Sequence, residues 1–236
     1  MDFVTLTDVV NYESEDAVLT EAAQVLGEQA AKTLDNLARD VITAGTTVQY
    51  ADDRANRYYI IASSLVTANE IREAVATLAG NNAKKITRIV NPSTGYNTTP
   101  INAAYVGITG PKTVYTLKGL TGWVPVQSYP NQGDVMDGEV GALDDVRFIS
   151  TSEAKYWAAA TASAAVDVHA TLILGQDAYG ITRISGEALK NIVKPLGSAG
   201  TADPLDQRTT SGWKATFVTK ILSDDAILRL EHSVAI

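Results

Sequence analysis

The clearest alternation of apolar and polar positions lies near the end of the chain. From Trp213 to Leu222, every second residue falls on one face, and that face carries Trp213, Phe217 and Ile221. The segment Ala226–Val234 alternates in the same way, and the polar residues Ser223–Asp225 separate the two. Period-two patterns on both sides of a short polar turn predict a β-hairpin. A preceding loop of about 18 residues, rich in Gly, Ala, Asp and Pro, is long enough to indicate a functional or interfacial role.

A different periodicity marks the strongest predicted helix. Apolar residues recur there every three or four positions, which places them on one side of a helix. Ser14 or Asp16 can cap its start, and Gly45 is a typical residue at its end. About 25 residues at 1.5 Å each give a helix of roughly 38 Å. The predicted apolar stripe consists of Leu19, Ala22, Leu26, Ala30, Leu34, Leu37 and Val41.

A second helix is predicted from its capping signal. Thr67 is followed three residues later by Glu70, so each side chain can accept a hydrogen bond from the other residue's backbone N–H. Val66 and Ile71 are spaced for the accompanying hydrophobic contact. The helix should end at Gly80.

The remaining elements make the chain a mixture of strands and helices, which predicts the α+β class. Pro111 should start a short helix, because proline is tolerated in the first turn. Residues 132–145 are predicted to be a connector, and residues 153–165 a small helix or a surface flap. Strands are predicted at residues 2–10, 46–51, 57–64, 86–90, 103–108, 146–150 and 166–174.

Composition narrows the class of protein. The chain has 236 residues, 45% of them apolar and 19% charged, which is typical of a folded globular protein. A net charge of −8 argues against sequence-specific or general binding of nucleic acid. The chain has no cysteine, so disulfides and thiolate chemistry are excluded. No signal peptide and no membrane-spanning apolar segment is predicted.

The segment Gly107–Thr113 follows a predicted strand and precedes a predicted helix, as a phosphate-binding loop does. Its spacing differs from that of a phosphate loop, because Pro111 separates Gly110 from Lys112 and removes a backbone donor. We therefore expect a plain strand-to-helix turn and no cofactor.

A group of five carboxylates lies between residues 134 and 145. Oxygen-rich loops can hold calcium, but this one lacks the alternating ligand pattern of a calcium-binding loop. We expect a solvated turn and no metal site. The group consists of Asp134, Asp137, Glu139, Asp144 and Asp145.

The two histidines complete the candidate chemistry. His169 is expected on the polar side of its strand beside Asp167 and Thr171, and His232 on the apolar face of the last strand. Neither belongs to a recognisable Ser-His-Asp set, so solvent-facing or hydrogen-bonded structural histidines are expected. We predict no catalytic residue.

Several stretches, in order along nearly the whole chain, resemble the major capsid proteins of tailed bacteriophages of the phage N-four type. The most specific is Lys194–Arg208 followed by Gly212–Thr216. The others are residues 19–31, 44–51, 138–141 with 146–148, and 152–155. This resemblance implies the Hong Kong-phage-type capsid fold, in which a long spine helix joins a peripheral domain to an axial domain with a mixed sheet flanked by helices.

The resemblance also implies domain limits and a function. Residues 1–43 and 196–236 would form the peripheral domain, and residues 44–195 the axial domain. The protein would be a non-enzymatic subunit of an icosahedral shell around phage DNA, made in the bacterial cytoplasm and located in the virion. Its partners would be copies of itself, with scaffolding or decoration proteins as further partners, and no membrane.

The family's N-terminal arm and extended loop have no counterpart in this sequence. These segments clasp neighbouring subunits in the family, so the resemblance implies that this chain folds but remains a monomer or small oligomer. Two alternatives stay open at this point: an α+β enzyme with dispersed active-site residues, or a ligand-binding module. A deep pocket with convergent polar groups would favour the enzyme, and a shallow aromatic surface the binding module.

Overall fold

The computed structural model describes residues 1–13, 18–90, 99–160, 166–183, 189–198 and 200–235. The chain forms two compact units, of residues 1–38 with 181–219 and of residues 39–180 with 220–236. The boundaries between the units fall inside one helix and two strands that form a separate two-stranded sheet. These elements are α2 (Val18–Thr43), β9 (Tyr179–Arg183) and β12 (Phe217–Ile221).

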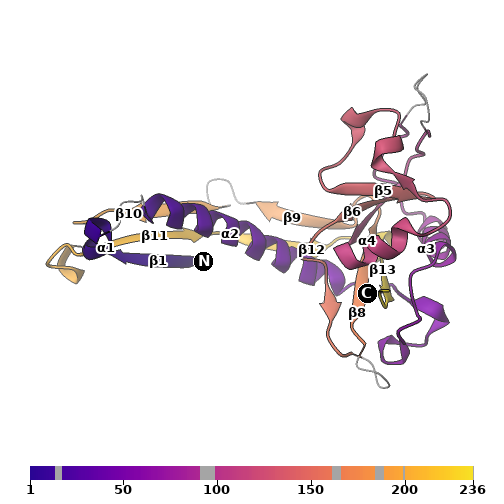
Figure 1. Ribbon diagram of the computed structural model, residues 1–236, viewed down its shortest axis with the longest axis horizontal. Helices are drawn as coiled ribbons and strands as arrows, with labels where there is room; N and C mark the ends of the chain where they lie inside the picture. Colours follow the sequence, from indigo (N-terminus) through magenta and orange to yellow (C-terminus); the bar gives the residue numbers. More distant parts are fainter. Residues whose placement is uncertain (14–17, 91–98, 161–165, 184–188, 199, 236) are drawn as a thin grey trace. The chain divides into compact units, whose positions relative to one another are not determined.

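The smaller unit is built on a three-stranded antiparallel sheet in the order β1-β11-β10 (Figure 1). One face of β11 is buried, and its Trp213 packs against Leu26 and Ala30 of α2. The helix therefore covers one side of this small sheet. The elements are β1 (Asp2–Thr7), α1 (Asp8–Glu13), β10 (Lys190–Lys194) and β11 (Arg208–Lys214).

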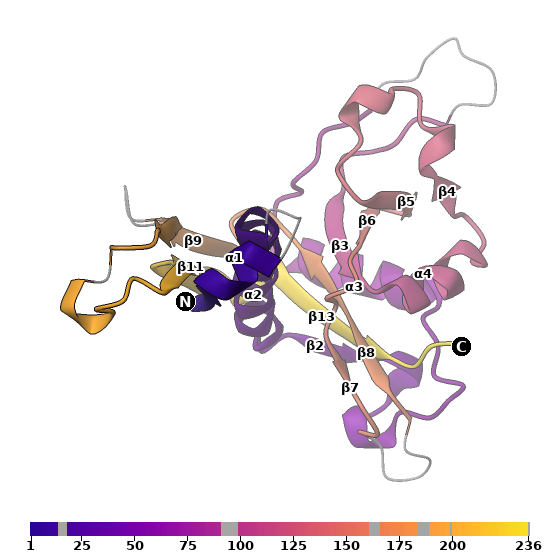
Figure 2. The same ribbon diagram turned by 60° about the vertical axis from the view of Figure 1, so that its left-hand side comes forward.

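The larger unit contains a mixed sheet in the order β2-β13-β8-β3-β6-β5-β4, with β7 paired to β8. Figure 2 shows β13 and β8 side by side, and their pairing is antiparallel. The pairs β13–β2 and β3–β6 are parallel. The strands are β2 (Val48–Tyr50), β3 (Tyr105–Thr109), β4 (Val124–Pro125), β5 (Glu139–Leu143), β6 (Val146–Ser150), β7 (Tyr156–Trp157), β8 (Val168–Leu174) and β13 (Ile227–His232).

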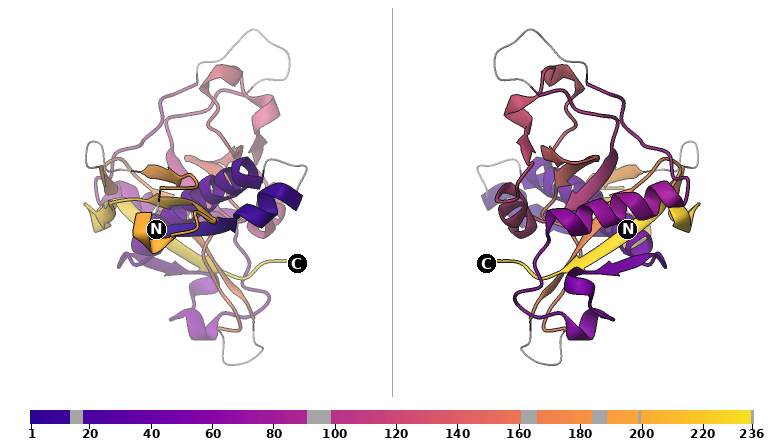
Figure 3. Two further views of the ribbon diagram at one scale, coloured as in Figure 1. Left: turned by 90° about the vertical axis from the view of Figure 1, so that its left-hand side faces the viewer. Right: turned by 90° about the vertical axis from the view of Figure 1, so that its right-hand side faces the viewer.

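Helices cover both faces of this sheet. On one face, α3 (Ala68–Gly80) and α4 (Pro111–Lys118) contribute Ile71, Leu78 and Leu117 to the main core cluster; α3 crosses in front of β13 in the right-hand view of Figure 3. On the other face, Ile42 near the end of α2 joins a second cluster. Short 3₁₀ helices are η1 (Ala51–Asp53), η2 (Arg57–Tyr59), η3 (Val126–Ser128), η4 (Gln132–Asp134), η5 (Gly200–Ala202) and η6 (Asp224–Ala226).

The long helix is confirmed, but its predicted stripe is wrong at the C-terminal end. Leu37 and Val41 are 53% and 37% exposed, whereas Ala38 and Ile42 are buried. The buried apolar residues of this helix, Leu26, Ala30, Ala38 and Ile42, are separated by multiples of four positions. The predicted stripe mixed steps of three and four, so near the end of the helix it lies one residue before the buried positions. The predicted caps Ser14 and Asp16 lie outside the described residues.

The predicted hairpin at the end of the chain is wrong. The segment from Trp213 to Leu222 is divided between β11 and β12, which belong to different sheets. The last strand, β13, pairs with β8 and β2 rather than with β12. Alternation along a strand determines which side chains share a face, but it does not determine the neighbouring strand.

Several shorter predictions also fail. The strand predicted at residues 2–10 ends at Thr7, since α1 begins at Asp8, and the segment predicted at residues 153–165 contains strand β7, with residues 161–165 outside the described residues. Residues 57–64 contain the 3₁₀ helix η2 instead of a strand, and residues 86–90 contain only an isolated bridge from Val90 to Ile101. The predicted connector at residues 132–145 contains strand β5. By contrast, β3, β6 and β8 form where strands were predicted, and α4 begins at Pro111.

The capping box at the start of α3 is confirmed. The Thr67 hydroxyl accepts a hydrogen bond from the Glu70 backbone N–H, and the Glu70 carboxylate accepts one from the Thr67 N–H. The other carboxylate oxygen of Glu70 accepts a hydrogen bond from the Asp52 N–H at 2.7 Å. Burial raises the pKa of Glu70, although these hydrogen bonds oppose the shift.

We expect Thr67→Ala to lower the free energy of unfolding by about 1 kcal/mol, because it leaves a helix N–H without its partner. Thr77→Ala is the matched control, since the Thr77 hydroxyl binds only the Glu73 carbonyl on the exposed side of the same helix. The two variants can be compared by urea denaturation. Equal stability of both would contradict a stabilising cap.

Candidate functional site

Packing between strands explains the first glycine of residues 107–113, the predicted strand-to-helix turn. Gly107 lies inside β3, and a Cβ atom there would come within 2.8 Å of the Phe148 ring. Gly110 is the N-cap of α4, and Pro111 is its first residue. Gly107 thus allows close packing of β3 against β6, and the segment forms the plain turn that was expected.

The five carboxylates between residues 134 and 145 do not converge. Asp144 pairs with Arg72 at 3.1 Å, and Asp145 pairs with Lys85 at 2.7 Å. Glu139 is turned into the interior, where its side chain is fully buried. The expectation of a solvated turn is therefore wrong for Glu139, which lies in a strand.

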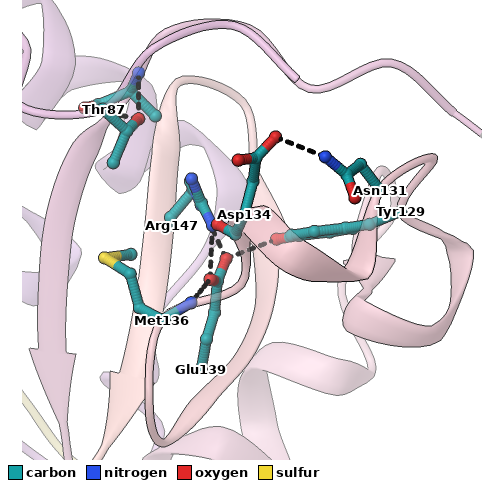
Figure 4. Close-up of polar contacts among 8 residues, drawn as sticks. Thr87, Tyr129, Asn131, Asp134, Met136, Glu139 and Arg147 are labelled. Atoms are coloured by element: carbon teal, nitrogen blue, oxygen red, sulfur yellow. Dashed lines mark hydrogen bonds and ion pairs between the residues drawn. The ribbon is translucent and has the colours of Figure 1, made fainter. Parts of the chain in front are cut away.

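Glu139 and Arg147 form a buried, two-pronged ion pair between β5 and β6 (Figure 4). Arg147 Nε and Nη2 lie 2.7 and 2.6 Å from the two Glu139 carboxylate oxygens. The same carboxylate accepts hydrogen bonds from the Tyr129 hydroxyl and from the Met136 N–H. Arg147 Nη2 also donates to the Asp134 carbonyl. Each charge thus has more than one polar partner.

This network ties an irregular segment to the sheet. Tyr129 and Met136 lie in residues 126–138, outside the strands, while Glu139 and Arg147 lie on paired strands. Burial and the hydrogen bond to Glu139 raise the pKa of Tyr129 far above its usual value, so the hydroxyl keeps its proton. The network holds the segment in place against the sheet.

A second buried ion network centres on Glu231 of β13. Its side chain is fully buried, and its carboxylate binds Arg57 Nε and Nη2 at 2.7 and 2.6 Å and Arg229 Nε at 2.7 Å. The Arg57 guanidinium stacks on the Trp157 ring at 3.4 Å from its centroid. Arg229 also donates to the carbonyls of Thr43 and Gly45. The sequence pattern placed Glu231 on a polar strand face, so its burial was missed.

The histidines lie together inside the sheet, and the polar environment expected for His169 is wrong. His169 is 9% exposed because β8 is buried on both faces. Its ring stacks between Tyr156, at 5.6 Å, and the fully buried His232, at 6.4 Å. His232 Nε2 shares a hydrogen bond with the Thr171 hydroxyl, and Nδ1 with the Ser233 carbonyl. His232 is thus the hydrogen-bonded structural histidine that was predicted.

One pocket brings together residue types that an enzyme could use. It has a volume of about 430 Å³ at the β3–α4 turn and is lined by Lys112, Ser152, Asp167 and His169 among others. These groups are not connected for catalysis: Asp167 accepts a hydrogen bond from the Ala159 N–H, and His169 Nε2 has no partner within the described residues. A nucleophile, base and orienting acid would need to be in hydrogen-bond contact.

Two further findings concern the described part of the chain. No group of three or more potential ligands from His, Asp and Glu is close enough to hold a metal ion there. Within the same residues, no helix combines the length and apolar character that a membrane span requires.

No protein-family model matches the chain, and no curated protein sequence matches it. Solved structures do match, and they define the class: the chain has the Hong Kong-phage-type capsid fold of phage shell proteins. This confirms the fold that the sequence resemblance implied.

Individual structures show the extent of this similarity. The capsid of Ralstonia phage GP4 matches with a TM-score of 0.66 and 11% identity, over 100% of this chain and 74% of that one. The capsid of cyanophage P-SCSP1u matches with a TM-score of 0.62 and 15% identity, over 99% and 72%. An encapsulin complex from Synechococcus elongatus matches with a TM-score of 0.59 and 10% identity, over 100% and 74%.

Proposed function

We propose that this chain is the major capsid subunit of a tailed bacteriophage and assembles into an icosahedral shell around the phage DNA. The observation that supports this most is the similarity of almost the whole chain to capsid chains from phages of different hosts. A shell subunit acts through its surfaces, so the absence of a connected catalytic set in the described residues is consistent with the role. The proposed place of action is the virion, after synthesis in the host cytoplasm.

The charge of the chain suits such a shell. A net charge of −8 disfavours general attraction to DNA, whereas a strongly basic lining would bind the packaged polyanion without specificity. The proposed partners are therefore other copies of the chain, with scaffolding or decoration proteins as additional partners.

We assign the smaller unit to the peripheral domain and the larger unit to the axial domain of the fold. The smaller unit has the three-stranded sheet and most of the long helix, and the larger unit has the mixed sheet with helices on both faces. The limits 1–43, 44–195 and 196–236 remain a prediction.

A shell of the encapsulin type is the second candidate, supported by the match to an encapsulin complex. Both candidate functions require the chain to assemble into a shell, but the two shells enclose different contents. The nucleic-acid content of purified particles separates the two, since a phage shell filled in its host carries DNA protected from nuclease.

The first test of the proposal is self-association of the purified chain. Sedimentation velocity over a wide range of concentration and salt should reveal oligomers that grow with concentration. A chain that stays monomeric under all conditions, and instead binds a small molecule in the pocket beside His169, would contradict a structural role and favour the enzyme alternative.

A further inference from the structure

The open face of the three-stranded sheet has an unusual charge for this chain. Directly paired residues share a face of an antiparallel sheet, so Phe3, Gly212 and Ile192 lie in one row on the side opposite the buried Trp213. The strand positions described on this side carry four basic side chains and no acidic one. The basic residues are Lys190, Lys194, Arg208 and Lys214.

An apolar slot lies in the middle of this basic face. It has a volume of about 380 Å³, and its lining includes Phe3, Ile192, Lys194 and Lys214. Asp2 also contributes to the lining, but it pairs with Trp213, and its carboxylate accepts a hydrogen bond from the Gln29 side-chain amide. Gly212 forms its floor; a Cβ atom there would come within 2.6 Å of Phe3 Cβ, so no larger residue fits. Lys194 and Lys214 are exposed and form no ion pair within the described residues. The slot therefore suits an apolar side chain with a carboxylate beside it.

The chain carries such a pair of residues at the opposite end of the same unit. Leu205 is 74% exposed, and the exposed Asp206 follows it in the loop between β10 and β11. Backbone hydrogen bonds shape this loop, and the buried Asp203 carboxylate fixes it by accepting a hydrogen bond from the Arg208 N–H at 2.8 Å. Leu205 is thus presented on an ordered turn.

The loop of the same chain does not fill the slot, because neither Leu205 nor Asp206 is among its lining residues. Phe3 pairs with Gly212 at the slot, whereas Thr7 pairs with Arg208 at the loop, four residues or about 13 Å further along the sheet. In Figure 1 the loop lies beyond α1, at the end of the sheet opposite the N-terminus. The loop of a second chain is therefore a candidate occupant.

We propose that Leu205 of one copy inserts into the apolar slot of a second copy, with Asp206 beside Lys194. This inference rests on the proposed shell function and identifies one of its contacts. The two surfaces differ, so the contact is head-to-tail, and such contacts build rings or extended lattices rather than closed dimers. The exposed Asp206 carboxylate complements the charge of the basic face, which supports this loop as the occupant.

The test measures self-association of the full chain by sedimentation velocity. Leu205→Ser, Lys194→Glu and Asp206→Lys should each weaken association about tenfold or more, because each removes or reverses a central contact. The double variant Lys194→Glu with Asp206→Lys should regain most of the lost affinity. Val25→Ser is the matched control, since Val25 is 64% exposed on α2 of the same unit, and it should associate like the wild type.

Unfolding midpoints equal to that of the wild type would establish that the variants fold. Unchanged assembly of Leu205→Ser, or a double variant no better than the single ones, would overturn this contact and leave the shell function intact. Loss of duplex-DNA binding by Lys194→Glu with unchanged self-association would also overturn it and identify the basic face as a phosphate site. A wild-type chain that never associates would contradict the shell function itself.

Discussion

Arg147→Ala should lower the free energy of unfolding by about 3–5 kcal/mol, because it leaves the fully buried Glu139 carboxylate without its counter-charge. Arg147 is 3% exposed and supplies two hydrogen bonds to that carboxylate, so the substitution removes the counter-charge and two donors from a buried site. Urea denaturation measures the change. The tie between the 126–138 segment and the sheet should loosen as well, which hydrogen exchange at Met136 would detect.

Arg72→Ala provides the matched control. Its pair with Asp144 has side chains 55% and 34% exposed, and such pairs contribute less than about 1 kcal/mol. Replacing both buried partners, with Arg147→Met and Glu139→Leu, should restore part of the stability, since no unpaired charge remains. The recovery is incomplete because the Tyr129 hydroxyl and the Met136 N–H lose their acceptor. If Arg147→Ala cost no more than Arg72→Ala, the ion pair would not be holding this part of the fold.

Acidification from pH 7 to pH 5 should destabilise the larger unit by about 2 kcal/mol through His232 alone. Burial lowers the pKa of His232 from 6.5 to about 4. Between these two values the unfolded chain binds a proton that the folded chain does not, so stability falls as the pH drops. Burial, followed by the charge of Lys112, also lowers the pKa of His169, which adds to the loss in the same direction.

The contribution of His232 is isolated by comparing how steeply the free energy of unfolding depends on pH in the wild type and in His232→Gln. Most carboxylates titrate below pH 5, and subtracting the profile of His232→Gln removes the groups common to both proteins. The variant should show a clearly shallower dependence of unfolding free energy on pH between 7 and 5, whatever its absolute stability. Identical slopes would mean that His232 is protonated equally in both states and is not the buried neutral group described.

Local signals predicted local structure well. The Thr67–Glu70 pair located the start of α3, and Pro111 located the start of α4, because each acts through backbone groups within one turn. The long helix was predicted for the same reason. Near its end, Leu37 and Val41 were wrongly assigned to the buried side. The spacing of apolar residues indicates a helix, but it does not determine which side of the helix faces the rest of the protein.

Pairing over long distances was not predictable in this way. The last strand alternates as the sequence indicated, yet its neighbours are β8 and β2, and the alternation holds no information on either. The burial of Glu231 was missed for the same reason. Glu231 lies on the polar face of its strand, and its partner Arg57 is 174 residues away in the sequence. The burial of Arg147 was missed as well, because a charge between Val146 and Phe148 fits the alternation of a half-buried strand, in which every second side chain faces solvent.

A subunit that acts in a shell, as proposed, would distribute its function over surfaces, and surfaces have no fixed spacing of residues along the chain. Exposed Leu205 and the basic face over Gly212 became recognisable only when β1, β10 and β11 were seen in register.

The central claim is that copies of this chain build a shell, and electron microscopy combined with mass measurement tests it most directly. Purified material should contain small oligomers or capsomer-sized assemblies whose masses are multiples of 25.1 kDa. Such assemblies, with the two units recognisable in each copy, are the predicted result. A uniform 25.1 kDa monomer at every concentration and salt would contradict the claim.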